Sequence, residues 1–251
     1  MIKIEDVEVM GMRKAIKGMR NAMNSWDKSD SKECGLRCIT SDVSLDDITC
    51  NEMCGGHLLR GYTQIGKDDM KLCKRLIKAG SSDRKFMRMI HVQCDVIAPL
   101  YWWKEYDTYK VGTTANSCST MHKIQDKEFT IDDFSHEQLL SWDYDKCPTF
   151  NYKFDNDEDS EYICTAESVL IHIIYALNHY RNKYIKTKDK TFWWQMIQLL
   201  PSSYNQMRTI DLSYETLFSI YHQRNNHKLD EWKEFCKWIK TLPYMKEFLE
   251  A

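Results

Sequence analysis

The residues whose types could best support binding or catalysis lie in a single stretch, Ala98–Ile124. Pro99 suits the first turn of a helix, because the missing N–H of proline has no partner there in any case. We expect a helix over Leu100–Tyr109 that Gly112 ends, since glycine readily takes the left-handed conformation found after a helix. Thr113–Met121 is then almost entirely small and polar. This segment could line a polar site, and a surface loop rich in serine and threonine is the alternative.

The cysteines form the next chemical grouping. Two pairs with His57 close behind have spacings that a structural zinc site can use: Cys34, Cys38, Cys50 and Cys54. Ordinary free thiols are the competing interpretation, and one sequence with this spacing is weak evidence. We therefore assign no metal ligands.

For two further sets of polar residues we predict no role in metal binding or catalysis. Asp155, Asp157 and Asp159 alternate, but they lack the glycine and the final glutamate of an EF-hand loop, so we predict no calcium site. Three histidines lie on a predicted strand or helix, where we expect them to be solvated or hydrogen-bonded rather than catalytic: His91, His172 and His179.

The stretch that begins at the proline resembles the signature of the flavin-dependent thymidylate synthases. In that family an Ala-Pro helix entry leads to an Arg-Gln pair, then to Arg-His-Arg, and seven residues later to a serine and a last arginine. Aligned without gaps, Lys104 and Glu105 stand at the Arg-Gln pair, and Thr108–Lys110 stands at Arg-His-Arg. Cys118 stands at the serine, and Thr120 stands at the last arginine.

A second block, nearer the C-terminus, resembles the same family. Leu199–Pro201 matches a Val-Leu-Pro segment, and a predicted strand over Met207–Leu212 and a helix follow without a gap up to Arg224. Arg224 stands at the arginine that holds the base region of the substrate in the family. Ser213 and Glu215 stand where an asparagine and an arginine face the flavin.

The resemblance implies roles for particular residues. Upstream of the signature, the family has a Gly-His-x-Ser/Thr-type segment that touches flavin, and Asp83 stands at its histidine. The implied cofactor-binding residues are Asp83, Arg84, Lys85, Tyr109, Lys110 and Ser213. The implied substrate-binding residues are Lys104, Glu105, Asn116, Thr120 and Arg224. We expect Arg224 to anchor an anion or a carbonyl, and Asn116 to bind a base edge with its donor and acceptor.

Cys118 and its neighbour Ser119 are the candidate catalytic residues. A thiolate near cations such as Lys110 or Arg224 would have a lowered pKa. Its attack on C6 of a pyrimidine would make C5 nucleophilic, which is a covalent route to modifying the ring. The competing interpretation is that Cys118 is inert and that Ser119 takes the place of the family's serine.

The resemblance also implies a fold and a reaction. We expect an α/β (α+β) fold with a central, mostly antiparallel sheet and flanking helices, in a homotetramer with active sites between subunits. The implied reaction is the reductive methylation of dUMP to dTMP, or a related pyrimidine modification, with FAD, NADPH and methylene-tetrahydrofolate. Four tryptophans offer apolar area for an oligomer interface, with core packing as the alternative: Trp102, Trp103, Trp193 and Trp194.

This sequence nevertheless departs from the family at cationic positions. Thr108, Thr120 and Ile197 carry no charge there, and Glu215 would repel a diphosphate. Each lost charge-assisted hydrogen bond is worth about 1.5–3 kcal/mol. Three interpretations follow: a divergent flavin-dependent enzyme, a nucleotide-binding module that retains the fold without catalysis, and an oligomeric interaction protein without a ligand.

Composition bounds these interpretations. Hydrophobic residues make up 43% of the 251, which suits one large domain over residues 1–251. Lys and Arg number 35 against 37 Asp and Glu, so the net charge of -2 argues against a general nucleic-acid binder. No apolar run reaches the length of a membrane span, and the start of the chain does not resemble a signal peptide. We therefore expect a cytoplasmic protein with reduced thiols.

The elements that must position these residues follow from hydrophobic periodicity. In the N-terminal half we expect an edge strand over Ile2–Val9 and an amphipathic helix over Met12–Trp26. A variable, cysteine-containing segment follows at 27–65. A helix then runs from Asp68 to Gly80, and a half-buried strand occupies Ile90–Val96.

In the C-terminal half, residues 125–162 form an acidic connection that we expect to be exposed and able to act as a lid. A helix with a buried apolar stripe covers Ala166–Tyr180, and the basic run Arg181–Lys190 is expected to be a solvated loop. An amphipathic helix ends at Arg224, and a closing helix carries Trp232–Ile239.

Overall fold

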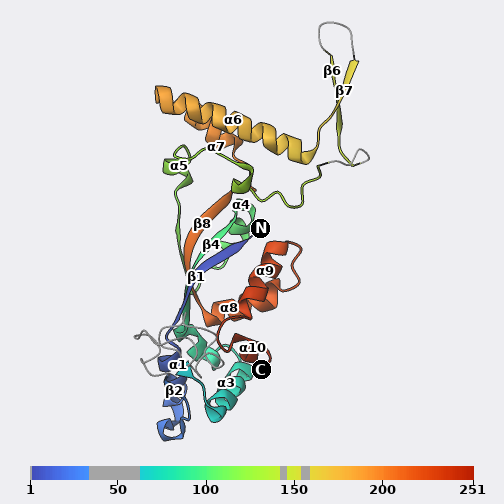
Figure 1. Cartoon of the computed structure of the whole chain (residues 1–251). Helices are drawn as coiled ribbons and strands as arrows, with labels where there is room; N and C mark the ends of the chain where they lie inside the picture. Colours follow the sequence, from blue (N-terminus) through green and yellow to red (C-terminus); the bar gives the residue numbers. More distant parts are fainter. Residues whose placement is uncertain (1, 34–62, 142–145, 154–158) are drawn as a thin grey trace, which may run out of the picture. The chain divides into compact units, whose positions relative to one another are not determined.

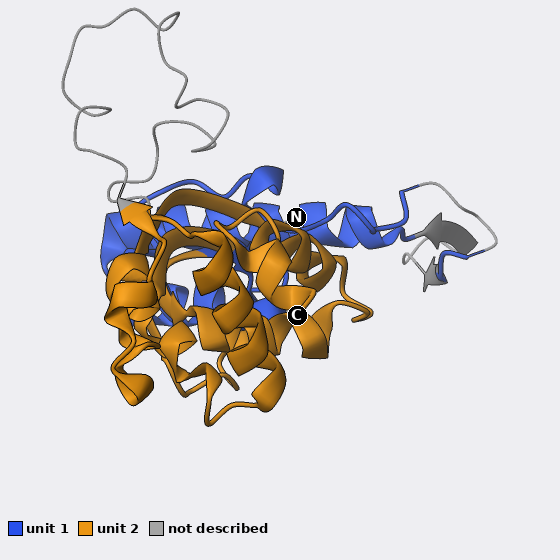
Figure 2. Ribbon diagram, turned by 90° about the horizontal axis from the view of Figure 1, so that it is seen from below, with its two compact units in different colours: residues 1, 98–104, 117–206 blue, residues 2–97, 105–116, 207–251 orange. Residues whose placement is uncertain are grey.

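The computed structural model describes residues 2–33, 63–141, 146–153 and 159–251. They form two compact units, which Figure 2 shows in blue and orange. Unit 1 comprises residues 98–104 and 117–206, and unit 2 comprises residues 2–97, 105–116 and 207–251. The single domain expected over the whole chain stays a prediction. The cysteine cluster, from Cys34 to Cys54, lies outside the described residues.

A four-stranded sheet is the central element, and it is antiparallel and flanked by helices, as predicted. Its order is β1-β4-β8-β5 (Figure 1). The strands are β1 (Lys3–Met10), β4 (His91–Pro99), β8 (Asn205–Ser213) and β5 (Thr113–Ser117). β1 pairs antiparallel with β4, with Lys3 opposite Ile97 and Val9 opposite Val92. The predicted edge strand at the N-terminus is therefore confirmed.

The alternation of apolar and polar residues gives β4 a buried face and an accessible one. Val92, Cys94 and Val96 are buried, whereas Gln93 between them is exposed. The accessible residue His91 lies 2.8 Å from an Asp211 carboxylate oxygen through Nδ1. The half-buried strand and the hydrogen-bonded histidine are both as predicted.

The helices of unit 2 pack around η5 (Arg84–Met89) and α8 (Tyr214–Arg224). η5 contacts α1, α3 and α8. α8 also contacts α9 and α10, which are labelled beside it in Figure 1. The bounds of these other helices are α1 (Met12–Gly18), α3 (Lys67–Ala79), α9 (Asp230–Ile239) and α10 (Met245–Leu249). Gly80, with a φ of 118°, is the C-cap of α3. Ser213 is the N-cap of α8, and its side chain accepts from Thr216 N–H at 3.2 Å. The predicted helices ending at Gly80 and Arg224 are confirmed, whereas α10 was not predicted from the sequence.

The helix expected over Met12–Trp26 was wrong beyond Gly18, where α1 ends. Two short 3₁₀ turns follow, η1 (Asn21–Met23) and η2 (Trp26–Lys28). Met23 is 84% exposed, so the methionine periodicity does not continue as a core stripe.

A buried ion pair explains why the chain turns there. Arg20 Nε donates to Asp69 Oδ1 at 2.5 Å, and these side chains are only 7% and 0% exposed. The hydroxyls of Ser29 and Ser31 each donate to Asp69 Oδ2 at 2.6 Å. The segment after α1 is thus tied to α3, because a buried charge needs its partners close by. The short strands β2 (Lys32–Glu33) and β3 (Thr63–Gln64) pair antiparallel with each other. β2 directly follows Ser31, and β3 lies shortly before α3.

Unit 1 has its own core between two adjacent helices, α6 (Ala166–Thr187) and α7 (Lys190–Leu199) (Figure 1). The buried cluster consists of Ile124, Phe129, Phe134, Leu170, Leu177 and Met196. The other elements of unit 1 are the first turn of α4 (Leu100–Tyr106), α5 (Thr120–Lys123), η6 (Ile131–Asp133), β6 (Thr149–Lys153) and β7 (Asp159–Ile163). β6 pairs antiparallel with β7.

Three expectations for this unit were wrong or incomplete. The connection over 125–162 is not simply exposed, because Phe129 and Phe134 belong to the core. The basic run Arg181–Lys190 was expected to be a loop, but α6 continues to Thr187, so the first seven residues of the run are helical. Trp102 and Trp103 are fully buried, so core packing, the alternative to an interface, holds for these two tryptophans. In the described part of the chain, no helix has both the length and the apolar composition needed to cross a membrane.

Candidate ligand-binding site

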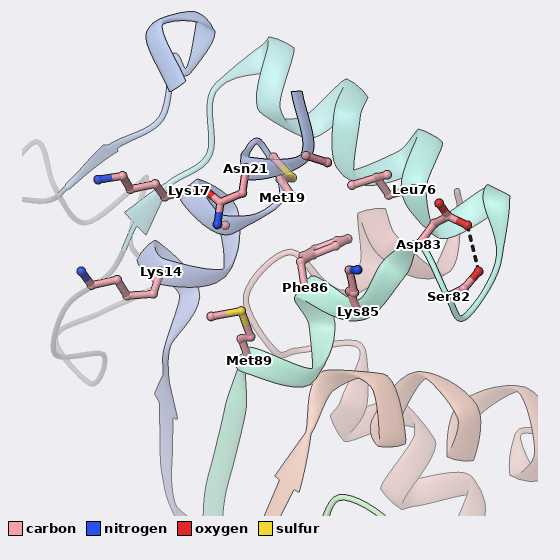
Figure 3. A pocket seen from close by; sticks show the side chains of 12 residues that line it. Lys14, Lys17, Met19, Asn21, Leu76, Ser82, Asp83, Lys85, Phe86 and Met89 are labelled. Atoms are coloured by element: carbon pink, nitrogen blue, oxygen red, sulfur yellow. Dashed lines mark hydrogen bonds between the residues drawn. The ribbon is translucent and has the colours of Figure 1, made fainter. Parts of the chain in front are cut away.

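A cavity of about 920 Å³ opens within unit 2 (Figure 3). α1 contributes Lys14 and Lys17, which share one side of the helix because they are three residues apart. η5 contributes Lys85 and Phe86, and α3 contributes Leu76. The remaining lining residues are Gly18, Met19, Asn21, Ala22, Ser82, Asp83 and Met89.

The cavity combines a cationic rim with an apolar wall. Among the described residues, no ion-pair or hydrogen-bond partner reaches the ammonium groups of Lys14, Lys17 or Lys85. Asp83 is the one carboxylate among the described lining residues, and it accepts a hydrogen bond from the Ser82 hydroxyl at 3.0 Å (Figure 3). Three cations against one anion favour a negatively charged ligand, while Phe86 and its apolar neighbours suit a ring system.

The predicted cofactor residues of this region divide in two. Asp83 and Lys85 both line the cavity. Arg84 does not, because its Nε donates to both carboxylate oxygens of Glu215, each at 3.0 Å. Its guanidinium also lies 4.6 Å from the centre of the Phe218 ring.

Sequence reasoning missed Lys14 and Lys17. The available signal was their spacing of three residues on a predicted helix. That spacing did not show which distant segment the two lysines would face. The apolar periodicity of the same helix predicted only which side would be buried.

A second cluster forms around Glu105, near the end of α4. One oxygen of this side chain, Oε2, accepts from Arg224 Nη1 at 2.8 Å and from Trp232 Nε1 at 2.9 Å. The Nε2 atom of His227 lies 3.3 Å from the same oxygen. Two residues predicted to bind substrate, Glu105 and Arg224, are therefore brought together and bind each other.

Aromatic rings and a hydroxyl hold the guanidinium of Arg224 in place. Its carbon lies 5.0 Å from the Trp232 ring centre and 5.7 Å from that of Tyr109, within the range of cation–π attraction. Arg224 Nε also donates to the Tyr109 hydroxyl at 2.9 Å, and this hydroxyl donates to Gln223 at 3.0 Å. Tyr109 thus supports Arg224 in this structure, and its predicted role in cofactor binding stays a prediction.

The other predicted residues of unit 2 lie apart from these contacts. Ser213 is only 4% exposed and caps α8. Lys110 and Asn116 are exposed, Lys110 before β5 and Asn116 within it. The small polar segment is thus partly a strand rather than a loop, and its roles in binding stay predictions.

Unit 1 contains Lys104 and the two candidate catalytic residues. Lys104 is exposed on α4. The Cys118 side chain is exposed, and its backbone carbonyl accepts from Gln206 Nε2 at 2.8 Å. Ser119 caps α5 by accepting from His122 N–H at 3.2 Å, and half-buried Thr120 is the first residue of that helix. The single substrate site predicted from these residues and Arg224 draws on both units and stays a prediction.

Burial distinguishes Cys118 from the three described cysteines of unit 2. Burial raises the pKa of the thiols of Cys73 and Cys94 to about 12 and that of Cys236 to about 11. A thiolate is the reactive form, so a raised pKa makes these three thiols less reactive at neutral pH. Among these four cysteines, Cys118 alone is exposed.

Comparison with solved structures places this architecture. The crystal structure of flavin-dependent thymidylate synthase ThyX from Helicobacter pylori, complexed with FAD and dUMP, matches with a TM-score of 0.59 and 14% sequence identity. The match covers 98% of this chain and 97% of that one. The chain has the fold of the flavin-dependent thymidylate synthases. The predicted fold class is therefore confirmed.

Two further structures support the same relationship. A second ThyX structure from Helicobacter pylori, with FAD and dUMP, has a TM-score of 0.57 at 14% identity, with coverages of 98% and 97%. The UMP/dUMP methylase PolB from Streptomyces cacaoi, bound with 5-Br dUMP, has a TM-score of 0.53 at 13% identity, with coverages of 100% and 95%. No protein-family model and no curated protein sequence matches this chain. The relationship to ThyX and PolB is thus one of fold.

Proposed function

We propose that this protein binds a flavin and a pyrimidine nucleotide and modifies the pyrimidine ring by reductive methylation or a related reaction. The observation that carries the proposal is the full-length fold shared with ThyX and PolB, whose solved structures hold dUMP or 5-Br dUMP. Similarity at 13–14% identity fixes the architecture and not the reaction, so the residues of the cavity must supply the rest.

The cavity in unit 2 fits a flavin in its chemistry. Its volume, about 920 Å³, lies in the range of small-molecule sites. Phe86 and Leu76 provide an apolar wall for a ring system, and Lys14, Lys17 and Lys85 provide charge for phosphate oxygens. A bound flavin would supply hydride transfer to the pyrimidine.

The part of this chain would then be to bind and orient. The lysines would attract the anionic end of the ligand as point charges, without the fixed fork of an arginine. The side chain of Asp83 accepts from Ser82, which keeps a carboxylate at the rim.

The experiment is to purify the protein and record its visible absorption, then to incubate it with FAD, NADPH, methylene-tetrahydrofolate and dUMP. We expect a flavin spectrum and a methylated nucleotide detected by mass spectrometry. Lys14→Gln combined with Lys17→Gln should weaken flavin binding about tenfold or more. The matched control is Lys71→Gln, an exposed lysine of α3 outside the cavity. A colourless protein that binds no added flavin would overturn the proposal.

We propose a test of Cys118 within the same function. Thiol labelling followed by mass spectrometry should modify exposed Cys118 faster than buried Cys73, Cys94 and Cys236. If Cys118 attacks the pyrimidine, dUMP should protect it. Rapid labelling that dUMP does not slow would leave Ser119 as the residue in the family's serine position.

A nucleotide-binding module without catalysis is the second candidate. It is favoured by the pairing of Arg84 with Glu215 and of Arg224 with Glu105, because each carboxylate neutralises a cation that the resemblance assigns to a ligand. A colourless protein that dUMP stabilises against heat would support this candidate. The homotetramer, the cytoplasmic location and the use of NADPH and methylene-tetrahydrofolate stay predictions.

A further inference from the structure

The contacts of Glu105 bear on which ligands Arg224 can accept. All the described partners of this carboxylate meet at Oε2, and Arg224 Nη1 is the nearest at 2.8 Å. Its side chain is 35% exposed and that of Arg224 is 21% exposed, so both groups remain within reach of solvent. A solute could therefore compete for this arginine.

The guanidinium is also fixed in direction. Its Nε donates to Tyr109, and its face lies over Trp232. Each two-pronged fork of a guanidinium pairs Nη2 with either Nε or Nη1, and both of these atoms already donate, so an incoming anion must compete with Tyr109 or Glu105 for such a contact. The carboxylate also cancels the positive charge that would draw the anion in.

His227 does not restore that charge when it is neutral. Its Nδ1 accepts from Leu229 N–H at 3.2 Å, which leaves the proton of the neutral ring on Nε2, the atom that faces Glu105. A neutral imidazole thus satisfies both neighbours. The cluster then carries one cation and one anion.

We propose that Glu105 is a specificity-determining residue that occupies Arg224 and closes it to phosphate and carboxylate groups, so that any ligand group bound there is uncharged. Introducing a second anion would place two negative charges on one arginine, which disfavours the charged ligand over a neutral one. The choice of nucleotides as ligands rests on the proposed function, whereas the closure of Arg224 rests on the contacts of Glu105 alone.

Glu105→Gln tests the proposal. Glutamine keeps an oxygen that can accept from Trp232 and Arg224, but it removes the competing charge. We expect the variant to bind inorganic phosphate and dUMP about tenfold or more tightly than the unmodified protein, measured by calorimetry at low salt. Adding Arg224→Gln should abolish the gain. Glu234→Gln, which removes an exposed carboxylate paired with Lys237 on α9, is the matched control and should bind phosphate as the unmodified protein does.

Unchanged phosphate affinity in a folded Glu105→Gln protein would overturn the inference. If the variant does not fold, the unmodified protein gives the answer through the NMR signal of the Arg224 Nε–H group, assigned by its loss in Arg224→Lys. Phosphate should leave this signal in place, and a saturable shift would overturn the inference. Both readouts need neither flavin nor turnover, so their failure is distinguishable from failure of the proposed function.

Discussion

Three of the guanidinium–carboxylate pairs in unit 2 differ in their burial. The side chains of Arg20 and Asp69 are 7% and 0% exposed, those of Arg84 and Glu215 are 19% and 13%, and those of Arg224 and Glu105 are 21% and 35%. The first pair joins the segment after α1 to α3 and has no room for a ligand. The last lies within reach of solvent. The same chemistry can therefore serve folding in one place and recognition in another.

The difference between the pairs follows from solvation. Removing one partner of a fully buried pair leaves a charge that water cannot reach, whereas an exposed charge regains its hydration. Asp69 makes this plain: burial alone would raise its pKa, yet the hydroxyls of Ser29 and Ser31, together with Arg20, hold its pKa below its usual value. The ionised form of Asp69 is therefore favoured over the protonated form more strongly in the folded protein than in the unfolded chain.

The largest expected effect comes from Asp69→Asn. It leaves the Arg20 charge buried without its counter-ion, so the free energy of unfolding should fall by about 3–5 kcal/mol. Urea denaturation followed by circular dichroism measures this change. Asp68→Asn is the control, since Asp68 is exposed and, among the described residues, its side chain pairs with Lys71 at 3.1 Å. Similar losses in both variants would remove the distinction between buried and exposed pairs.

Acid should reproduce part of that loss. Because the folded pKa of Asp69 lies below its unfolded value, near 3.9, its contribution to stability is complete above that pH. It should disappear as the pH falls through the folded pKa. Unfolding curves between pH 5 and 2 should show a steeper decline for the unmodified protein than for Asp69→Asn. Parallel declines would mean that Asp69 is not the titrating group.

Glu215→Gln should have an intermediate effect. Both of its carboxylate oxygens accept from Arg84, and the pair is mostly buried, so we expect a loss of about 2 kcal/mol in the free energy of unfolding. The same denaturation assay measures it. A loss below that of exposed-pair variants would break the ordering by burial.

Glu105→Gln should cost the least, about 1 kcal/mol or less, because its pair is partly solvated and glutamine still accepts from Trp232. Small destabilisation combined with tighter phosphate binding would mark this pair as one that acts on ligands. A cost equal to that of Asp69→Asn would instead assign it to the folding core.

Much of the fold could be predicted from local patterns. Alternation identified β4, Gly80 marked the end of α3, and an amphipathic repeat ending at Arg224 identified α8. β8 was expected where the resemblance places a strand after Pro201. These signals are local, since a strand or helix repeats over two or four residues and its ends depend on their immediate neighbours. The sequence by itself therefore determined most of the elements, and the spacing of its motifs was enough to indicate the thymidylate synthase-like fold.

Only the tertiary structure decided what each charged side chain does. Glu105 and Arg224 are 119 residues apart, and Arg84 and Glu215 are 131 apart, yet each pair is in contact. Arg20 likewise pairs with the distant Asp69 in the interior, and the expected helix ends at Gly18, just before this arginine. Electrostatic attraction depends on distance in space and on burial, and neither is encoded in the spacing of residues along the chain. The sequence could name the cations of a ligand site, but only the fold determined which of them were already neutralised.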